Sequence, residues 1–316
     1  MTQPTQNQVH VDKVLTQISI AYMNELASFV ATEVFPVISV DKQSDKYWEY
    51  TQADWFRDEA ALRADATESE GSGYGVTTST YFCDVYGFHK DIGNQTRQNA
   101  DAPLNVDADA ARFVTHTLML RQEIQWVTDY FASSIWGTDS TPSNLWSNYG
   151  TSDPIDNVET GKATILTNTG RFPNTMVLGY NVYRQLRNHP DIIDRIKFTS
   201  FQTVTEDLLA RVFDVDRVLV AKAIKNTANE GASASYSLTH GKHALLAHVA
   251  DTPGLLTPSA GYTFMWKGVS QGMGTNVAVS RMDMPLKKAT RVEAEIAWDN
   301  KVIATNLGYF FASAVA

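Results

Sequence analysis

The chain has 316 residues, 43% hydrophobic and 19% charged, a balance typical of an ordinary globular protein of about two domains. A net charge of −9 argues against electrostatic binding of nucleic acid, because such binding needs Lys and Arg side chains clustered near the phosphates. The single cysteine, Cys83, excludes an intrachain disulfide and a cysteine-based metal cluster, and no apolar run approaches the ~20 residues of a membrane span.

The N-terminal region begins with a polar, Gln-rich segment, 1–10, that lacks the features of a signal peptide, so we expect folding in a reducing cytoplasm. Apolar residues at spacings of three and four then predict a short amphipathic helix: Leu15, Ile18, Tyr22, Leu26 and Phe29. This helix could belong to a core or dock on a neighbouring subunit. The next segment, 34–40, is apolar but contains Pro36, which lacks an amide hydrogen. We therefore expect an edge strand or an extended arm there.

Residues 47–97 are predicted to form an extended two-stranded loop, because the stretch has few regular apolar periods. The β-forming residues 77–86 would be its returning strand, and the glycine-rich segment 68–75 its flexible tip. A compact enzyme rarely keeps so long an irregular segment, so we expect the loop to reach another subunit. Aromatic and arginine side chains dominate interface energetics. The predicted interface anchors are Trp48, Tyr50, Trp55, Phe56 and Arg57.

The clearest helix is predicted at residues 107–133, where Asp107 and Asp109 complement the helix dipole. At ~1.5 Å per residue it would be roughly 40 Å long. Its predicted buried stripe consists of Phe113, Thr117, Leu120, Ile124, Val127 and Phe131. Its predicted polar face consists of Thr115, Arg121, Gln122, Gln125 and Asp129. Trp126 borders that polar face, and we expect it to touch something outside the domain.

The second half of the chain opens with a polar region, 137–162, that we expect to be a loop. A compact α/β unit should follow, made of a strand at 176–178, a helix capped by Asn181 and ended by Pro190, a helix capped by Thr205 and a strand at 217–223. Near the C-terminus, apolar residues alternate with Glu over 292–298, which predicts a half-buried strand. Asp299 and Asn300 would then form a hairpin turn into a returning strand at 301–315.

Candidate catalytic and metal motifs are weak. Gly268–Gly272 matches the nucleophile elbow of serine hydrolases, with Ser270 as the nucleophile. The elbow needs a helix after it and a downstream histidine, whereas a strand is predicted next and no histidine follows His248. His240, His243 and His248 have spacings that do not place all three on one face. We therefore predict no enzyme activity, no cofactor and no metal site.

The order of the predicted elements and the residues of several segments resemble those of the major capsid proteins of tailed bacteriophages, which have the Hong Kong 97 phage-type fold. The segments that carry the resemblance are Val34–Tyr50, Asp107–Ser133, Leu178–Arg184 and Val292–Phe311. The resemblance implies an α+β fold with an N-terminal arm (1–45), an extended β loop (46–98), a peripheral β-sheet domain (99–168 and 283–316) with the long spine helix (107–133), and an inserted axial α/β domain (169–282). Some relatives crosslink Lys to Asn, but Lys90 and Asn94 are not assigned as such a pair.

The function that the resemblance implies is structural: self-assembly into an icosahedral head that encloses double-stranded DNA without sequence-specific binding. The implied partners are other copies of the chain in hexamers and pentamers, a separate scaffolding protein, a portal and, as a further candidate, a decoration protein; no membrane is involved. The protein would be part of the virion and would assemble in the host bacterial cytoplasm. Two alternatives are an encapsulin-type compartment shell and a serine hydrolase that uses Ser270.

Overall fold

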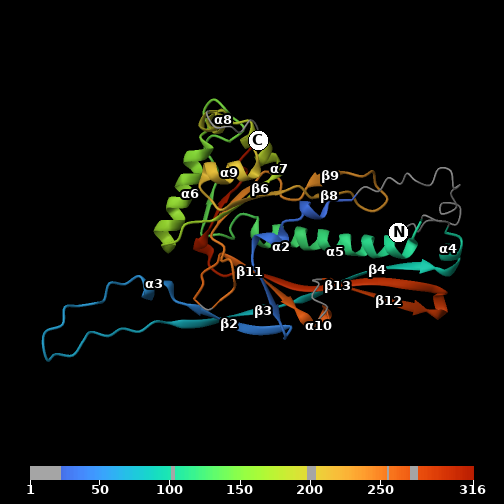
Figure 1. Cartoon of the computed structure of the whole chain (residues 1–316), viewed down its shortest axis with the longest axis horizontal. Helices are drawn as coiled ribbons and strands as arrows, with labels where there is room; N and C mark the ends of the chain where they lie inside the picture. Colours follow the sequence, from blue (N-terminus) through green and yellow to red (C-terminus); the bar gives the residue numbers. More distant parts are fainter. Residues whose placement is uncertain (1–22, 101–103, 198–203, 255, 271–276) are drawn as a thin grey trace.

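The computed structural model describes residues 23–100, 104–197, 204–254, 256–270 and 277–316, apart from the side chain of Ser270. The molecule is elongated (Figure 1): a long helix lies along a five-stranded sheet, a compact α/β body covers one end, and a β-hairpin projects beyond that end. Among the described residues, no helix is both long enough and apolar enough to cross a membrane.

The long sheet is organised around β13 (Ala289–Val302), which pairs antiparallel with three other strands. These are β4 (Asp84–Gly93), β11 (Gly261–Trp266) and β12 (Ala278–Met284), and β1 (Val37–Val40) adds to β11 in parallel. From 292 to 296 the apolar residues of β13 are buried and its glutamates are half-exposed, so the predicted alternation is confirmed. β1 lies at the sheet edge directly after Pro36, as predicted, because proline cannot donate to a second neighbouring strand.

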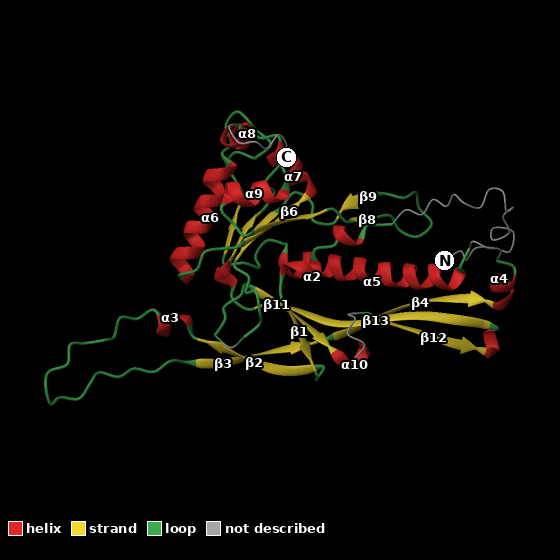
Figure 2. Ribbon diagram, in the orientation of Figure 1, coloured by secondary structure: helices red, strands yellow, loops and turns green. Residues whose placement is uncertain are grey.

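The projecting hairpin consists of β2 (Ser44–Tyr50) and β3 (Val76–Phe82), paired from Ser44↔Phe82 to Tyr50↔Val76. A single helical turn, α3 (Gln52–Trp55), follows β2, and residues 56–75 contain no helix or strand (Figure 2). The structure thus has a two-stranded hairpin as predicted, but it spans 44–82, and residues 84–93 of the predicted loop belong to the long sheet. The predicted returning strand is divided at the buried Cys83, after which the chain enters the long sheet as β4.

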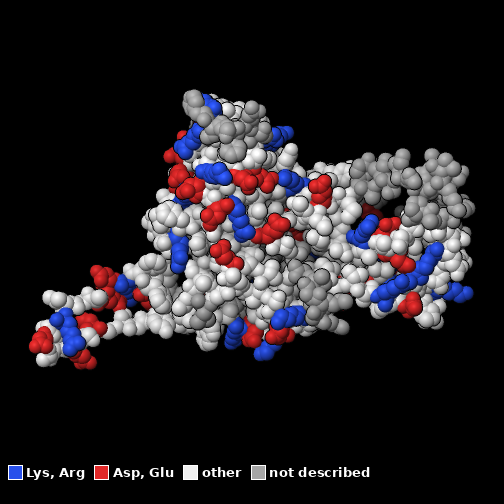
Figure 3. All heavy atoms as spheres, in the orientation of Figure 1, with Lys and Arg blue, Asp and Glu red and all other residues white. Residues whose placement is uncertain are grey.

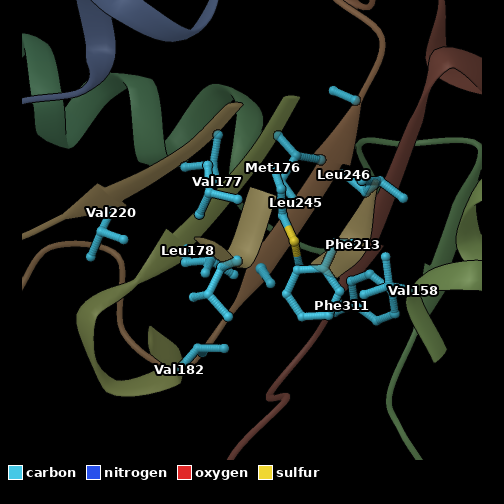
Figure 4. Packing of buried hydrophobic residues seen from close by; sticks show 14 of the residues in the cluster. Val158, Met176, Val177, Leu178, Val182, Phe213, Val220, Leu245, Leu246 and Phe311 are labelled. Carbon is cyan, nitrogen blue, oxygen red and sulfur yellow. The ribbon is translucent and has the colours of Figure 1, made fainter. Parts of the chain in front are cut away.

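The compact body contains a second five-stranded sheet, in the order β5-β14-β10-β6-β7. Its strands are β5 (Thr138–Ser140), β6 (Thr175–Gly179), β7 (Arg217–Ala221), β10 (Ala244–Ala247) and β14 (Gly308–Phe311). Its helices are α6 (Pro154–Thr169), α7 (Tyr180–Arg187), α8 (Pro190–Ile196) and α9 (Glu206–Phe213). Every residue of β6, β10 and β14 is buried, and Figure 4 shows Leu178, Leu245 and Phe311 packed in this core.

The remaining described elements are short. They are η1 (Leu26–Ser28), α2 (Ala31–Val34), α4 (Asn94–Gln98), the hairpin of β8 (Ile224–Asn226) and β9 (Tyr236–Leu238), α10 (Lys267–Ser270), η2 (Pro285–Lys287) and η3 (Thr305–Leu307). Of the helix predicted over 15–29, residues 15–22 lie outside the described residues. The prediction is wrong for 23–29, where only the single turn η1 is helical. At its end, Leu26 is exposed and Phe29 is buried.

Several predicted boundaries in the second half are wrong. The predicted loop 137–162 contains the start of α6, where the Asp153 side chain accepts from the amides of Ile155 and Asp156 and Pro154 occupies the first turn. Asp299 and Asn300 lie inside β13 instead of forming a turn. The strand after them, β14, joins the sheet of the compact body and does not pair with β13. Conversely, β11 and β12 lie in the long sheet, although 169–282 was assigned to the axial domain.

Of the two helix N-caps predicted from the sequence, Thr205 is confirmed and Asn181 is wrong. The Thr205 side chain accepts from the amide of Leu208 and starts α9, as expected. Asn181 does not cap α7, because that helix already begins at Tyr180 with Gly179 at the N-cap. His189 begins a new helix, α8, with Pro190 in its first turn.

The spine helix is α5 (Val106–Tyr130), started by the Asn105 side chain, which accepts from the amide of Ala108. Its predicted buried stripe is wrong: Phe113 is 46% exposed, and Leu120, Ile124 and Val127 are only half-buried. Of the predicted core residues only Phe131, just after the helix, is fully buried. The residues that are buried along α5 are Ala110, Val114, Leu118, Gln122, Glu123, Trp126 and Tyr130.

Contacts with segments far away in the sequence determine which face of α5 is buried. Val114 and Leu118 face the long sheet, in a cluster with Val292 and Ile296. Trp126, predicted to touch something outside the domain, is fully buried beside Phe35 and Tyr130. Gln122, predicted to be solvated, is 5% exposed. The helix is thus covered on two sides, and the apolar side chains of Phe113, Leu120 and Ile124 do not mark its buried face.

Candidate assembly surface

The base of the projecting hairpin is fixed to the long sheet by aromatic stacking. The ring of Phe264 on β11 stacks on Tyr81 of β3 at a centroid distance of 4.6 Å and on Tyr47 of β2 at 5.6 Å. The amide of Phe82 also donates to a carboxylate oxygen of Asp299 at 2.8 Å. These contacts fix the direction in which the base of the hairpin leaves the long sheet.

The predicted interface anchors are largely uncovered in the single subunit. Trp48, Trp55 and Phe56 are 63%, 54% and 65% exposed, and Tyr50 is half-buried. Tyr74, which the sequence analysis did not single out, joins Tyr50 and Trp55 in a ring cluster with centroid distances of 5.5–6.3 Å. Apolar rings gathered on one exposed surface mark a protein interaction site.

The structure brings four of the five anchors into one groove of about 970 Å³. Its walls include the hairpin, residues 253–254 and 256–259 of the loop before β11, and residues 303–307 after β13. The anchors that line it are Trp48, Tyr50, Trp55 and Phe56. Arg57 does not line the groove and lies 3.8 Å from Asp54 and 3.7 Å from Glu59. Leu256, 59% exposed, also lines the groove; no periodicity in the sequence marks it, since it lies in an irregular loop.

A second feature connects the spine helix to the compact body. Residues 23–35, which we call the N-terminal strap, cross α5 and bond to both parts. The amides of Val30 and Ala31 donate to the carboxylate of Glu123 at 2.9–3.2 Å, and the amide of Asn24 donates to His116 Nε2 at 3.1 Å. On the body side, the Arg217 guanidinium donates to the Val34 carbonyl at 2.8 Å.

The Glu123 carboxylate is fully buried, which raises its pKa to about 7 despite the two amide hydrogen bonds that favour the charged form. The carboxylate of Glu33 on the strap also raises this pKa. His240 Nδ1 lies 3.7 Å from the Glu123 carboxylate, and burial lowers the pKa of His240 to about 3. Sequence reasoning missed Glu123, because a lone glutamate in a helix gives no sign that it is buried.

The three clustered histidines have separate partners. His240 Nδ1 lies 3.0 Å from Thr239 Oγ1, the Ser313 amide donates to His243 Nδ1 at 3.0 Å, and His248 Nδ1 lies 2.7 Å from the Phe172 carbonyl. Within the described ranges, no group of three or more His, Cys, Asp or Glu side chains is arranged to hold a metal ion. Ser270 is the last residue of the helical turn α10, which follows β11, whereas the serine of a nucleophile elbow lies between the strand and the helix.

One trio resembles a Ser-His-Asp triad but is oriented the wrong way for catalysis. Ser152 Oγ lies 3.0 Å from His189 Nε2, and an Asp191 carboxylate oxygen lies 3.6 Å from His189 Nδ1. The Asp191 amide donates to Nδ1, so the ring proton is on Nε2 and points at the serine oxygen. A catalytic histidine needs a free Nε2 to accept the serine proton. The serine hydroxyl instead donates to the Asn148 carbonyl at 2.7 Å, and the trio fixes the start of α8.

Exposed aromatic rings on a hairpin that projects from one end of the molecule (Figure 1) are typical of a subunit that contacts other protein chains. No protein-family model matches the chain. Comparison with individual proteins identifies the family.

The chain belongs to the major capsid proteins of phages. It is 30% identical to the major capsid protein of Burkholderia phage BcepMu over 271 residues, which are 82% of this chain and 84% of the relative. It is 25% identical to the major capsid protein of Pseudomonas phage JBD67 over 315 residues, 97% of each chain. Both relatives thus match over most of their length, and the family resemblance seen in the sequence is confirmed.

Solved structures support the fold. A phage-related protein from Bordetella bronchiseptica RB50 superposes with a TM-score of 0.69 at 21% identity, covering 92% of this chain and 93% of that one. The capsid of Cyanophage P-SCSP1u gives 0.61 at 8% identity, covering 97% and 93%. An encapsulin from Synechococcus elongatus gives 0.51 at 10% identity, covering 95% and 94%. The predicted α+β phage capsid fold is confirmed. The encapsulin alternative rests on shared fold alone, whereas the phage family rests on sequence identity.

Proposed function

We propose that this chain is the non-enzymatic building block of an icosahedral phage head that encloses double-stranded DNA, with copies arranged in hexamers and pentamers. Family membership supports the role in the virion. The single observation that carries the proposed mechanism is the exposed aromatic surface of the hairpin, with Trp48 and Phe56 more than 60% uncovered in the isolated subunit. These rings would be buried against a neighbouring copy.

The proposed mechanism is the binding of subunits to one another, with no catalysed reaction. Aromatic anchors in a desolvated contact supply most of an interface's free energy. Each subunit of a closed shell makes several such contacts at once, so weak individual contacts are sufficient for a stable particle. With a net charge of −9, the subunit has no overall positive charge to bind the phosphates of the enclosed DNA. This suits DNA that must leave the shell again.

The proposed partners beyond other copies are a separate scaffolding protein, a portal and a decoration protein, with assembly in the host bacterial cytoplasm. The family supports this proposal, since such components accompany shells of this kind. Co-expression of the chain with candidate neighbouring phage proteins, followed by analysis of particle composition, tests which of them associate.

The experiment that tests the proposed function replaces residues 57–73 with a short Gly-Ser linker. This segment has no helix or strand, and a Cβ added at Gly71 or Gly73 would meet no other atom within 4 Å, so the subunit should fold normally. We expect soluble, folded subunits that form no closed shells by light scattering and negative-stain microscopy. Normal shells from this variant would refute the role of the loop.

A matched pair of substitutions tests the aromatic anchors. Trp48→Ala should reduce assembly strongly, because an exposed indole at an interface centre contributes about 2 kcal/mol or more to binding. Tyr236→Ala, which removes a 69% exposed ring from the β8–β9 hairpin, serves as the control for loss of an exposed aromatic ring on a different surface. Equal assembly by both variants would contradict the choice of the β2–β3 hairpin as the contact.

A further inference from the structure

The long sheet has an unpaired strand edge. Residues 76–93 are extended and interrupted only at Cys83, so β3 and β4 follow each other almost as one strand. β2 pairs with the first half of this segment, 76–82, and β13 pairs with the second half, 84–93. In the part of the chain that the structure describes, β4 pairs with no strand other than β13. One edge of β4 is therefore open.

Two backbone hydrogen bonds show which groups line this edge. The amide of Cys83 donates to the carbonyl of Gln43, next to β2, at 2.9 Å. The amide of Asn94 donates to the carbonyl of Lys288, next to β13, at 3.0 Å. Because successive residues of such a strand direct their amides and carbonyls to alternate sides, the odd-numbered residues of β4 face away from β13. The backbone groups that form the open edge belong to Val85, Gly87, His89, Asp91 and Gly93.

The side of α5 that lies over β4 is uncovered as well. Phe113 packs against Phe88 at a centroid distance of 5.7 Å, and the Lys90 ammonium lies 5.3 Å from the centre of the Phe113 ring. Phe113 is nevertheless 46% exposed. At helical spacing along the same side are Leu120 and Ile124, which are only half-buried. We call this side the open flank of α5; it is the stripe that the sequence pattern assigned to a core.

The open edge and the open flank lie on the same side of the molecule, since Phe113 contacts β4 directly. Figure 2 shows β4 at the margin of the long sheet, beneath α5. An unpaired strand edge is a template for another strand. Paired strands lie about 4.8 Å apart and packed helices about 8–10 Å apart. A second copy turned through half a turn would therefore bring strand to strand and helix to helix in one contact.

We propose that β4 of one copy pairs antiparallel with β4 of a second copy across a two-fold axis at His89, and that the open flanks of their α5 helices pack together. The length of the open edge sets the register. It is filled from end to end only when Val85 lies opposite Gly93 of the second copy, which places His89 at the centre. A shifted strand would run into β2, which occupies the same side from Cys83 backwards.

This inference rests on the proposed shell function and adds a contact that does not use the projecting hairpin. A two-fold contact is self-complementary, because each copy presents the same surface to the other. Both α5 helices then lie on the same face of a continuous sheet. That arrangement suits neighbouring subunits of a shell, which must present the same face to the interior.

The side chains that this register brings together are compatible. Lys90 of each copy lies opposite Phe88 of the other, and an ammonium group beside an aromatic ring is attractive. Asp91 lies opposite Gly87, so the carboxylate meets no other charge there. Within 85–93 no two side chains of like fixed charge are opposed. Only the two His89 side chains face each other directly, on the exposed face of the sheet.

The same axis joins the two open flanks. Phe113 contacts the residues on both sides of His89, so the two Phe113 rings approach each other near the axis. The half-exposed stripe of α5 then becomes part of a buried interface, which accounts for its apolar spacing. Figure 3 shows Lys and Arg side chains close to Asp and Glu side chains over the end of the molecule where α5 begins, so charge of one sign does not keep two copies apart.

Amide exchange at single-residue resolution tests the strand pairing. In unassembled subunits, the even-numbered amides of β4 should exchange slowly because they bond to β13, and the odd-numbered amides should exchange quickly. In assembled shells the odd-numbered amides should slow at least about tenfold, since they then donate to the second strand. Fast exchange at these positions in shells would overturn the proposal. So would protection that requires a co-assembled second protein, because that protein would then be the occupant of the edge.

Charges at His89 test the register. Its side chain is exposed, so substitutions should leave thermal unfolding of the subunit unchanged. His89→Glu alone and His89→Lys alone each place two like charges opposite each other, and each should reduce the yield of shells at least about tenfold. An equal mixture of the two variants should assemble better than either, because Glu can then lie opposite Lys. His89→Ala, the uncharged control, should assemble like the wild type. Normal assembly of His89→Glu, or a mixture no better than its components, would contradict this register.

Proline tests the backbone directly. His89→Pro removes an amide that faces the open edge, so the subunit should fold normally while shells are lost at least about tenfold, since two backbone hydrogen bonds disappear at each contact. Phe88→Pro, the matched control, removes an amide that bonds to β13 and should lower the Tm of the subunit itself. Normal shells from His89→Pro, together with failure of the 57–73 replacement, would overturn the β4 contact alone. Failure of the wild type to form shells would overturn the proposed function, and this inference with it.

Discussion

Glu123→Gln should change how the stability of the subunit depends on pH. The carboxylate is fully buried on α5, and burial raises its pKa from 4.5 to about 7. Because the folded-state pKa lies above the unfolded one, the folded chain binds this proton more tightly. Protonated Glu123 therefore increases the free energy of unfolding below pH 4.5, and this increase is lost as the pH rises to about 7.

The magnitude follows from the difference between the two pKa values. A shift from 4.5 to about 7 corresponds to roughly 3 kcal/mol at about 1.4 kcal/mol per pH unit. His240 acts in the opposite direction: its pKa is lowered from 6.5 to about 3 by burial, so acid destabilises the fold through it. Between pH 4.5 and 6.5 the two effects oppose each other, and the wild-type curve should be shallow.

In Glu123→Gln the pH dependence of stability that is due to Glu123 is lost, and the pH dependence that is due to His240 remains. We therefore expect Glu123→Gln to lose stability steeply on acidification from about pH 6.5 to 5, while near pH 8 it should be as stable as the wild type or more so, since no charge is buried. At about pH 5 the difference from the wild type should be about 2–3 kcal/mol larger than at pH 8. Thermal unfolding of dissociated subunits at both values measures it.

Parallel pH profiles for the wild type and Glu123→Gln would refute this reasoning, because the carboxylate would then have the same proton affinity in both states. A parallel loss of amide protection at Val30 and Ala31 in the variant would support the strap contact, because these amides donate to Glu123.

Two further predictions concern packing. Val114→Asp should destabilise the subunit by about 3 kcal/mol or more, since it places an unpaired carboxylate on a fully buried face of α5, whereas Phe113→Ala on the exposed face should cost about 1 kcal/mol in thermal unfolding. Gly308→Ala should destabilise the body by about 1–3 kcal/mol, because the new Cβ would overlap the Trp136 ring, while Gly71→Ala in open space should stay within about 0.5 kcal/mol. Equal shifts within either pair would contradict the packing described.

The aromatic anchors illustrate what sequence reasoning can and cannot find in the site. Trp48, Trp55 and Phe56 were identified because they lie in a segment without core periodicity, and the structure leaves them exposed. Their roles as contacts remain a prediction. Tyr74 and Leu256 were missed, because each comes near the others only through the hairpin pairing and the approach of a distant loop.

The sequence by itself determined the features that depend on near neighbours in the chain. The alternation of 292–298 defined a half-buried strand, Thr205 capped α9, and Pro36 placed β1 at an edge. In each case the cause is local, since side-chain direction, capping and the missing amide are properties of a few consecutive residues.

The tertiary structure alone decided which surface each element buries. The buried face of α5 depends on β13, more than 160 residues later, and on the strap, whose Val30 is 93 residues before Glu123. Helix α6 is rich in Thr and Asn, and its Gly161 lies against Phe311 and Leu246 of the second sheet. Likewise β14 pairs with β10 instead of β13. These choices follow from burial between segments far apart in sequence, for which local patterns carry no information.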